Sequence, residues 1–264
     1  YFGVAPAIAP IIGGWLFVHT GWHSIFWFLT FVGVALWTAN FRLLPETLHV
    51  EQRQPFHVRH LMRGYLQLGT SARFVLLALA SGVPFNGMFL YVLSAPAFLG
   101  DHLSLAPTQF FWFFVLTISG IMGGAWLSGR LAGRIPPKRQ IRHGFVIMFS
   151  VAVLNLVANL LFTPHAWWAL APIAVFSFGW ALMVPVVTLL VLDLYPERRG
   201  MASSMQAFVG SSANGLVAGV IAPLVMHSTV LLALSSLLML CIGMLSWICL
   251  HHHWPEIGRT PVHL

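Results

Sequence analysis

Long apolar runs recur along this chain, and they constrain its fold more than any other feature. Two of them, FWFFVLTISGIMGGAWLSG and FVIMFSVAVLNLVANLLF, flank the stretch GRLAGRIPPKRQIRHG at residues 129–144. A helix needs about 20 apolar residues to cross a hydrocarbon core about 30 Å thick, and each run is close to that length. Only 7% of the residues are charged, against about 25% in soluble domains. The sequence therefore predicts an integral membrane protein.

Eight apolar segments separated by turns are predicted to be transmembrane helices of an all-α fold. They cover about 2–18, 24–41, 73–99, 108–128, 144–162, 167–191, 201–225 and 229–250. The longest non-apolar stretch, at about 45–72, is predicted to be a cytoplasmic linker between two halves. The expected domains are two helices at 1–44, this linker at 45–72, a six-helix half at 73–252 and a cytoplasmic tail at 253–264.

Basic residues orient these segments. Five of the 13 Lys and Arg residues lie in 129–144, and basic loops stay on the cytoplasmic side of a membrane. Crossing the membrane from this stretch places all 13 Lys and Arg residues on one side, together with the C-terminus. The excess of basic residues thus indicates topology and contact with anionic lipid rather than with nucleic acid.

Proline and glycine concentrate in the third and sixth apolar segments. These residues are Gly82, Pro84, Gly87 and Pro96 in the third segment and Pro172, Gly179 and Pro185 in the sixth. Interrupted helices at matching places in two three-helix repeats are typical of transporters, and such helices line the binding site. Glycine and proline are also common in membrane helices generally, so both interpretations stay open.

Short motifs in this order resemble those of the major facilitator superfamily. The stretch Gly129–Arg134, followed by Pro137-Lys-Arg139, resembles the loop signature between the second and third helices of each six-helix half, with Gly133 in place of the family's Asp. The stretch Pro10-Ile-Ile-Gly13-Gly14 resembles the end of the drug:proton antiporter motif on the fifth helix.

Two further motifs extend the resemblance to the rest of the chain. Leu44-Pro-Glu-Thr-Leu48 is similar to the end of the sixth helix, and Pro196-Glu-Arg-Arg-Gly200 to the loop between the tenth and eleventh helices. With SAPAFLGDHLSLAPTQF, these motifs resemble the Bcr/CflA group of multidrug efflux proteins. The resemblance implies that the eight segments are helices five to twelve of twelve, that the first four are missing, and that this chain alone is inactive.

The resemblance implies a function in transport. It implies export of lipophilic drugs or small metabolites in exchange for protons, by alternating access, in the bacterial cytoplasmic membrane. We expect a monomer whose partners are a small-molecule substrate, protons and the lipid bilayer. A facilitator or symporter for a polar solute is one alternative, and it predicts more charged or amide residues in the cavity. A membrane-embedded enzyme or a non-transporting scaffold is another.

No pattern in the sequence points to catalysis or to a bound cofactor. There is no phosphate-binding loop, no metal-ligand spacing and no nucleophile constellation, so we expect no enzymatic activity, no cofactor and no metal. No Asp or Glu lies in the middle of any predicted segment. The resemblance implies that the proton-carrying acids lie on the missing first helix.

Polar and aromatic residues within the segments are the candidates for a substrate cavity. Asn86 and Tyr91 lie on the third segment, while Gln206 and Asn214 lie eight residues apart on the seventh, nearly on one helical face. An adaptable apolar surface would come from Phe85, Phe89, Trp180 and Met183. Core or lipid contact is the alternative for these aromatic and methionine side chains, and contact between helices is the alternative for Gln206 and Asn214. Asn155 and Asn159 are expected to make contacts between helices.

Two further sets of residues are assigned structural roles. Arg130 and Arg134 carry guanidinium groups suited to a carboxylate, and the resemblance would bring Asp193 near them. We expect a conformational latch, made in one state and broken in the other; arginines that only set topology are the alternative. Pro10 removes a helix donor, and Gly13 and Gly14 remove bulk, which permits close packing against a neighbouring helix.

Overall fold

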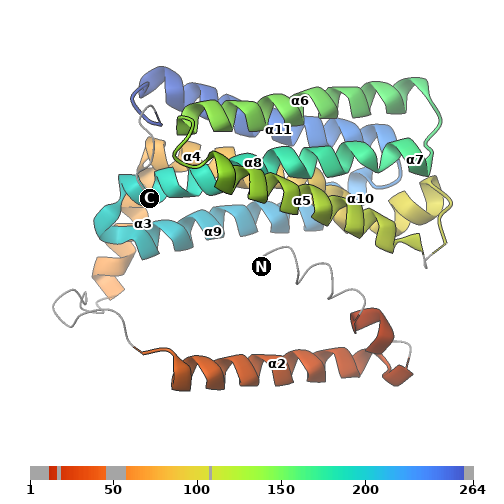
Figure 1. The fold of residues 1–264 in the computed structure, drawn as a ribbon, viewed down its shortest axis with the longest axis horizontal. Coiled ribbons are helices and arrows are strands. Elements are labelled where there is room, and N and C mark those ends of the chain that lie inside the picture. The colour runs from red at the N-terminus through yellow and green to blue at the C-terminus, as the bar shows by residue number, and fades with distance from the viewer. Residues whose placement is uncertain (1–11, 17–18, 46–57, 107–108, 259–264) are drawn as a thin grey trace. The chain divides into compact units, whose positions relative to one another are not determined.

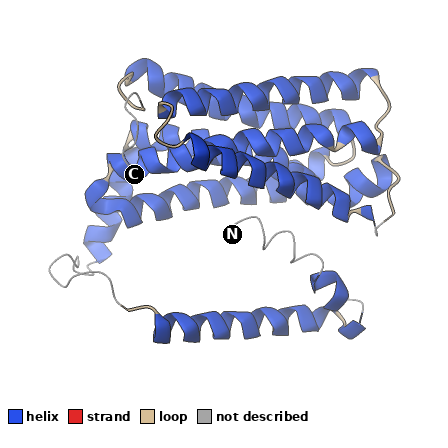
Figure 2. Cartoon of the chain, in the orientation of Figure 1, coloured by secondary structure: helices blue, strands red, loops and turns tan. Residues whose placement is uncertain are grey.

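The computed structural model describes residues 12–16, 19–45, 58–106 and 109–258. Regular secondary structure within these ranges is entirely helical, with no strand (Figure 2). The chain divides into a unit at 1–62 and a unit at 63–264, and each is described by itself. Seven of the described helical stretches are long and apolar enough to cross a membrane.

The first unit contains a short helical stretch at 12–16 and helix α2 (Trp22–Leu43). None of the 22 residues of α2 is buried, and Trp27, Phe31 and Phe41 are among its exposed side chains. Such an apolar surface is stable against lipid or against other helices. The predicted first segment, at about 2–18, lies largely outside the described residues and stays a prediction.

The second unit is a bundle of long helices (Figure 1). In chain order these are α4 (Ala72–Leu93), α5 (Phe111–Leu131), α6 (Pro137–Leu161), α8 (Ala171–Leu194), α9 (Arg199–Leu216) and α11 (Thr229–His253). Shorter pieces connect or extend them: α3 (Val58–Thr70), η2 (Pro96–His102), α7 (Ala166–Ala169), η4 (Pro196–Arg198), η5 (Val217–Ile221) and α10 (Ala222–Val225). The second to eighth predicted spans are all found as helices.

Helices α4 and α8 form the core of the bundle. Helix α8 packs against α5, α6 and α4, and helix α4 also packs against α11 and α9. In the apolar stretch that includes each of these two helices, 56% of the residues are buried. In the apolar stretch from α9 to α10, only 11% of the residues are buried. The bundle therefore leaves one face of α9 exposed, next to the two central helices.

Glycines allow α5 to approach α8 closely. A Cβ added to Gly120 would collide with the carbonyl group of Ala174, and one added to Gly124 with the carbonyl oxygen of Phe178. Small residues four apart let membrane helices pack backbone against backbone, where van der Waals contact replaces the missing hydrophobic driving force. This contact fixes α5 on the outside of α8.

The basic stretch at 129–144 is largely helical, contrary to the prediction of a loop. Helix α5 continues to Leu131, and α6 begins at Pro137, because a proline is well tolerated at the first position of a helix. Lys138, Arg139 and Arg142 consequently lie on the first two turns of α6. Only residues 132–136 connect the two helices.

The predicted third and sixth segments are both broken in the structure, but not at Pro84 or Pro185. Helix α4 ends at Leu93 and η2 begins at Pro96, and Leu170 separates α7 from α8, which has Pro172 in its first turn. Pro84 lies inside α4 and Pro185 inside α8, and both helices continue past them. Pro84 packs closely against α11, where a Cβ on Gly243 would collide with the proline ring.

The predicted linker at 45–72 contains a helix in its second part. Helix α3 contacts α9 through Tyr65, whose hydroxyl lies 2.9 Å from the hydroxyl of Ser204. The Arg198 guanidinium also donates a hydrogen bond to the Gln67 side chain at 2.7 Å. These contacts attach the end of the linker to the start of α9.

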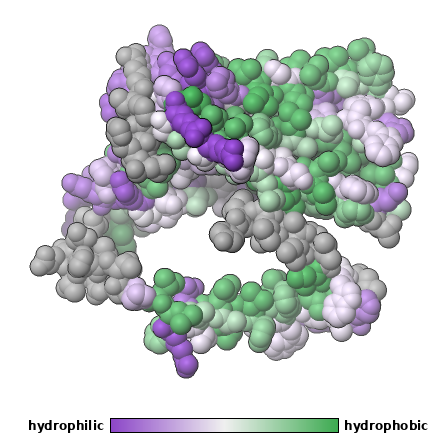
Figure 3. All heavy atoms as spheres, in the orientation of Figure 1, coloured by the Kyte–Doolittle hydropathy of each residue, from purple (hydrophilic) through white to green (hydrophobic). Residues whose placement is uncertain are grey.

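Strongly hydrophilic side chains gather at the end of the bundle where α6 begins, and hydrophobic ones cover the middle of the helices (Figure 3). Basic residues lie at the matching ends of four helices: Arg73 on α4, Arg130 on α5, Lys138 on α6 and Arg199 on α9. The basic residues thus gather at one end of the bundle, and a cytoplasmic orientation of that end stays a prediction.

Candidate functional site

An aromatic cluster lies where α4 and α8 pack together. The ring centroids of Phe85 and Phe89 on α4 are 5.4 Å apart, and that of Trp180 on α8 is 4.9 Å from that of Phe85. All three side chains are half-buried in the described structure. Because Phe85 and Phe89 are four residues apart, they share one face of α4, and the cluster forms a partly exposed apolar surface.

Hydrogen bonds continue this surface onto α9. The Trp180 indole donates to the backbone carbonyl of Ser81 at 3.1 Å. The Gln206 side-chain amide donates to the Ser81 hydroxyl at 3.0 Å and to the Thr188 hydroxyl at 3.3 Å. Unpaired polar groups are costly in apolar surroundings, so these bonds hold the Trp180 and Gln206 side chains in defined positions. We call Ser81, Phe85, Phe89, Trp180, Thr188 and Gln206 the aromatic–amide surface.

Ser81 and Thr188 were missed as candidate residues in the sequence. Ser81 lies four residues before Phe85, and Thr188 lies eight residues after Trp180. These spacings place each of them on the same face as an aromatic residue that was selected. A polar residue spaced four or eight residues from a candidate aromatic residue is therefore the sequence signal that could have identified Ser81 and Thr188.

Two predicted residues, Asn86 and Asn214, carry buried side-chain oxygens that accept no hydrogen bond from any described residue. Helices α4 and α9 run in the same direction, since Ser81 contacts Gln206 and a Cβ on Gly82 would lie 3.2 Å from the Gly210 Cα. Asn86 lies four residues after Gly82 on α4, and Asn214 lies four residues after Gly210 on α9. The two asparagines therefore lie at the same height along the paired helices.

Three residues predicted to line the cavity are inside the bundle in this structure. Asn86 is fully buried, and its Nδ2 donates to the Gly82 carbonyl of its own helix at 3.2 Å. Tyr91 is 3% exposed and accepts a hydrogen bond from the Asn155 side chain of α6 at 2.8 Å. Met183 is 0% exposed.

The burial of Tyr91 and Met183 has a common cause, which is the packing of α6. Asn155 pairs with Tyr91 from that helix, and Gly144 of α6 lets Met183 lie directly against its backbone. Both side chains therefore face α6 rather than the aromatic–amide surface, and a cavity-lining role for them stays a prediction. The expected interhelical role of Asn155 is confirmed.

The residues of the predicted latch have other partners here. Asp193 forms an ion pair with Arg199 at 3.6 Å, in which both side chains are exposed. The Arg130 guanidinium lies over the Trp126 ring, 4.2 Å from its centroid. Arg134 follows Gly133, whose φ of +72° turns the chain between α5 and α6. A latch joining Asp193 to Arg130 or Arg134 stays a prediction about another conformation.

The predicted packing motif is described only in part. Pro10 lies outside the described residues, while Gly13 and Gly14 lie in the helical stretch 12–16. A Cβ added to either glycine would meet no described atom within 4 Å. Close packing at these glycines therefore stays a prediction.

The fold and this surface define a multi-pass helical membrane protein with a polar and aromatic face beside its two central helices. The profile of the Major Facilitator Superfamily matches residues 1–218, so the chain belongs to this family. That assignment confirms the family predicted from the sequence motifs.

Individual relatives are similar over most of the chain. A bicyclomycin resistance protein homolog of Haemophilus influenzae is 24% identical over 231 residues, covering 86% of this chain and 57% of the relative. Multidrug resistance protein D of Escherichia coli is 26% identical over 265 residues, covering 97% of this chain and 64% of the relative. An uncharacterized MFS-type transporter of Bacillus subtilis is 27% identical over 225 residues, covering 84% and 54%. The chain thus spans between half and two thirds of the length of these relatives.

Proposed function

We propose that this chain forms part of a proton-coupled exporter of lipophilic small molecules that works by alternating access. The observation that carries the proposal is the aromatic–amide surface, where Phe85, Phe89 and Trp180 are half-buried beside a fixed amide, Gln206. Aromatic surfaces with few, well-placed polar groups are typical of sites for small apolar ligands. Membership of a family of transporters supports a transport role rather than an enzymatic one.

The names of two relatives support drugs as the substrate class. One relative is a bicyclomycin resistance protein homolog and another is a multidrug resistance protein. The same two relatives are bacterial, which supports the cytoplasmic membrane of a bacterium as the location. We also propose a monomer with a cytoplasmic C-terminus.

The proton pathway is proposed to lie outside the described helices. The described carboxylates, Asp101, Asp193, Glu197 and Glu256, lie at helix ends or in connections. Proton relays in transporters use ionisable groups within the membrane, so we propose that coupling uses a group outside the described helices.

A facilitator or symporter for a polar solute is the second candidate. The observation that favours it is the row of amides on α9, where Gln206 and Asn214 lie eight residues apart and the Asn214 oxygen is unpaired among the described residues. Such groups would bind a solute rich in hydroxyl or amino donors. The two candidates differ in the direction of transport and in the polarity of the substrate.

Everted membrane vesicles test the proposal. Vesicles from cells that express the protein, as its gene encodes it, are energised and given the lipophilic cation ethidium or a radiolabelled sugar. We expect energised accumulation of ethidium, its loss on addition of a protonophore, and no accumulation in vesicles without the protein. Sugar movement without ethidium movement would contradict the proposal and support the second candidate.

A further inference from the structure

A groove lies between α6 and α11, on the side of these helices away from the aromatic–amide surface. Its volume is about 610 Å³. Phe145 and Trp247 form its floor, being 3% and 6% exposed. Val146, Phe149 and Ile248 form its exposed apolar walls. The groove is thus an apolar channel along the outer surface of the bundle.

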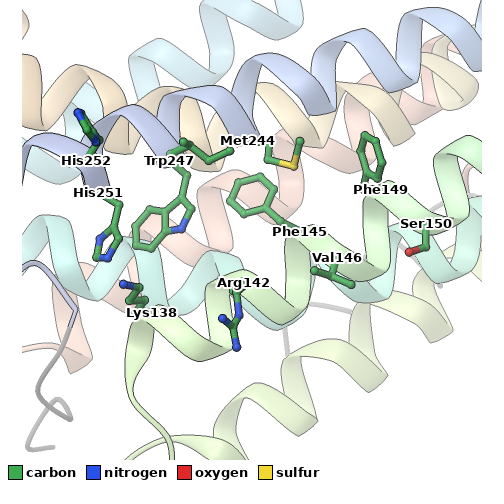
Figure 4. A pocket seen from close by; sticks show the side chains of 11 residues that line it. Lys138, Arg142, Phe145, Val146, Phe149, Ser150, Met244, Trp247, His251 and His252 are labelled. Carbon is green, nitrogen blue, oxygen red and sulfur yellow. The ribbon is translucent and has the colours of Figure 1, made fainter. Parts of the chain in front are cut away.

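The two helices present matching stripes to this groove. On α6 the lining residues Lys138, Arg142 and Phe149 are spaced by four and seven, and on α11 Met244, Trp247 and His251 are spaced by three and four. Such spacings place each set on one helical face. Figure 4 shows Lys138, Arg142 and His251 toward the end where α6 begins, with Met244, Phe149 and Ser150 toward the other end.

The basic end of the groove has no acidic side chain among the described residues that line it. Lys138 and Arg142 lie one turn apart on the first two turns of α6, so their cationic groups can approach one anion together. His251 stacks on Trp247, with ring centroids 5.9 Å apart, which continues the polar end onto α11. The groove is therefore cationic at one end and apolar along the rest of its length.

The length of the groove matches one leaflet of a bilayer. Lys138 and Ser150 are 12 residues apart on α6, which is about 18 Å of helix at roughly 1.5 Å per residue. Half of a hydrocarbon core about 30 Å thick is about 15 Å. A lipid whose headgroup lies at Lys138 can therefore extend an acyl chain along the full apolar length of the groove.

We propose that this groove binds one anionic phospholipid, with its phosphate group at Lys138 and Arg142 and an acyl chain between α6 and α11. Basic pockets between membrane helices bind acidic headgroups, and the apolar floor adds the contact that a free phosphate cannot make. The site is independent of the proposed drug export, because it depends only on the membrane-spanning fold and lies away from the aromatic–amide surface.

Native mass spectrometry of the protein released from nanodiscs tests this site. The nanodiscs contain equal amounts of phosphatidylglycerol and phosphatidylcholine with identical acyl chains, so that only the headgroup differs. We expect one retained phosphatidylglycerol per protein and little phosphatidylcholine. In the Lys138→Gln, Arg142→Gln double variant, the preference for phosphatidylglycerol should fall about tenfold, because each basic residue near a membrane surface contributes to binding an anionic lipid.

A matched control removes two positive charges at the same end of the bundle, outside the groove. Arg130 and Arg134 are both exposed and line neither the groove nor the adjoining pocket at Lys138, Arg139 and Arg142, so Arg130→Gln with Arg134→Gln should retain the lipid as the unchanged protein does. Ser150→Trp fills the apolar end and should reduce retention of phosphatidylglycerol without removing any charge. Thermal unfolding of each variant confirms that it is folded.

Four results would overturn the proposal. Equal retention of both lipids would show a groove without headgroup selectivity, and an equal loss in the control variant would show a general surface charge effect. Displacement of the lipid by soluble glycerol phosphate at similar concentration would assign a phosphate site. A dimer without bound lipid would assign the groove to a second copy of the chain.

Discussion

Asn214 and Asn86 combine a buried side-chain oxygen with the absence of a hydrogen-bond partner among the described residues. Leaving a buried acceptor unpaired costs about 1–3 kcal/mol, and both asparagines lie at the same level of the contact between α4 and α9. Asn86 is fully buried, whereas Asn214 is partly exposed. Asn214 is therefore the one of the two whose side chain borders the surface, and its buried oxygen becomes accessible to a substrate when that side chain turns outward.

Asn214→Leu distinguishes a substrate contact from a structural residue. The change removes an unpaired acceptor, so we expect the melting temperature to stay the same or to rise slightly. Transport of a substrate with an amino donor should fall about three- to tenfold, the usual effect of losing one neutral hydrogen bond. Vesicle transport and thermal unfolding of the purified variant measure the two effects.

Asn159 supplies the control for Asn214. Its side-chain oxygen is also buried without a described partner, but it lies on α6 and its Nδ2 donates to Asn155. Asn159→Leu should leave transport unchanged. Equal losses in the two variants would show that the effect of Asn214→Leu comes from the fold and not from substrate contact.

Asp193 is the residue at which the predicted latch is tested. Its pair with Arg199 is exposed on both sides, and such pairs contribute little to stability. If Asp193 acts by pairing with Arg130 or Arg134 in another conformation, Asp193→Asn should cut transport at unchanged expression, whereas Arg199→Gln should not. Vesicle transport with immunoblotting measures both variants. Normal transport by Asp193→Asn would leave the arginines with a role in topology alone.

At the scale of helices, the contact of α5 with α8 depends on glycine. Gly124 faces the Phe178 carbonyl directly, while Gly129 on the same helix has no atom within 4 Å of an added Cβ. Alanine favours a helix over glycine by about 1 kcal/mol, so the same substitution should act in opposite directions at the two positions.

Gly124→Ala should lower the melting temperature in detergent, and Gly129→Ala should leave it unchanged or raise it slightly. Overpacking costs about 1–3 kcal/mol in well-packed cores, and the Phe178 carbonyl is backbone that cannot rotate away. Thermal unfolding of both variants in one detergent provides the measurement. Equal melting temperatures would contradict the close approach of α5 and α8.

The sequence was sufficient to predict the helices but not the faces that they bury. Apolar length and basic residues located the second to eighth spans, because membrane helices must satisfy their own backbone. Helix α8 is apolar on its buried and exposed sides alike, so no periodicity shows that Met183 faces α6 while Trp180 faces α4. The start of α6 was predicted too late, because charged residues such as Lys138 lie on its first turns and were assigned to a loop.

At the scale of the whole molecule, topology is the property on which localisation and the lipid site depend. All 13 Lys and Arg residues fall on one predicted side. Reporter fusions after Arg53, Pro137 and the C-terminus should report cytoplasm, and fusions near Asp101 and His165 should report the exterior. An exterior Pro137 fusion would contradict every other orientation, since all of them are counted from the start of α6.

Transport by Trp180→Ala, compared with Trp167→Ala, tests most directly whether the aromatic–amide surface carries substrate. Trp180 contacts Phe85 and donates to the Ser81 carbonyl, whereas Trp167 is 89% exposed at the far end of the bundle. Both variants remove the same side chain, and energised ethidium accumulation in everted vesicles is measured at equal expression. We expect at least a tenfold loss, or about 1.4 kcal/mol, for Trp180→Ala and none for Trp167→Ala. Normal accumulation by a folded Trp180→Ala protein would contradict the account.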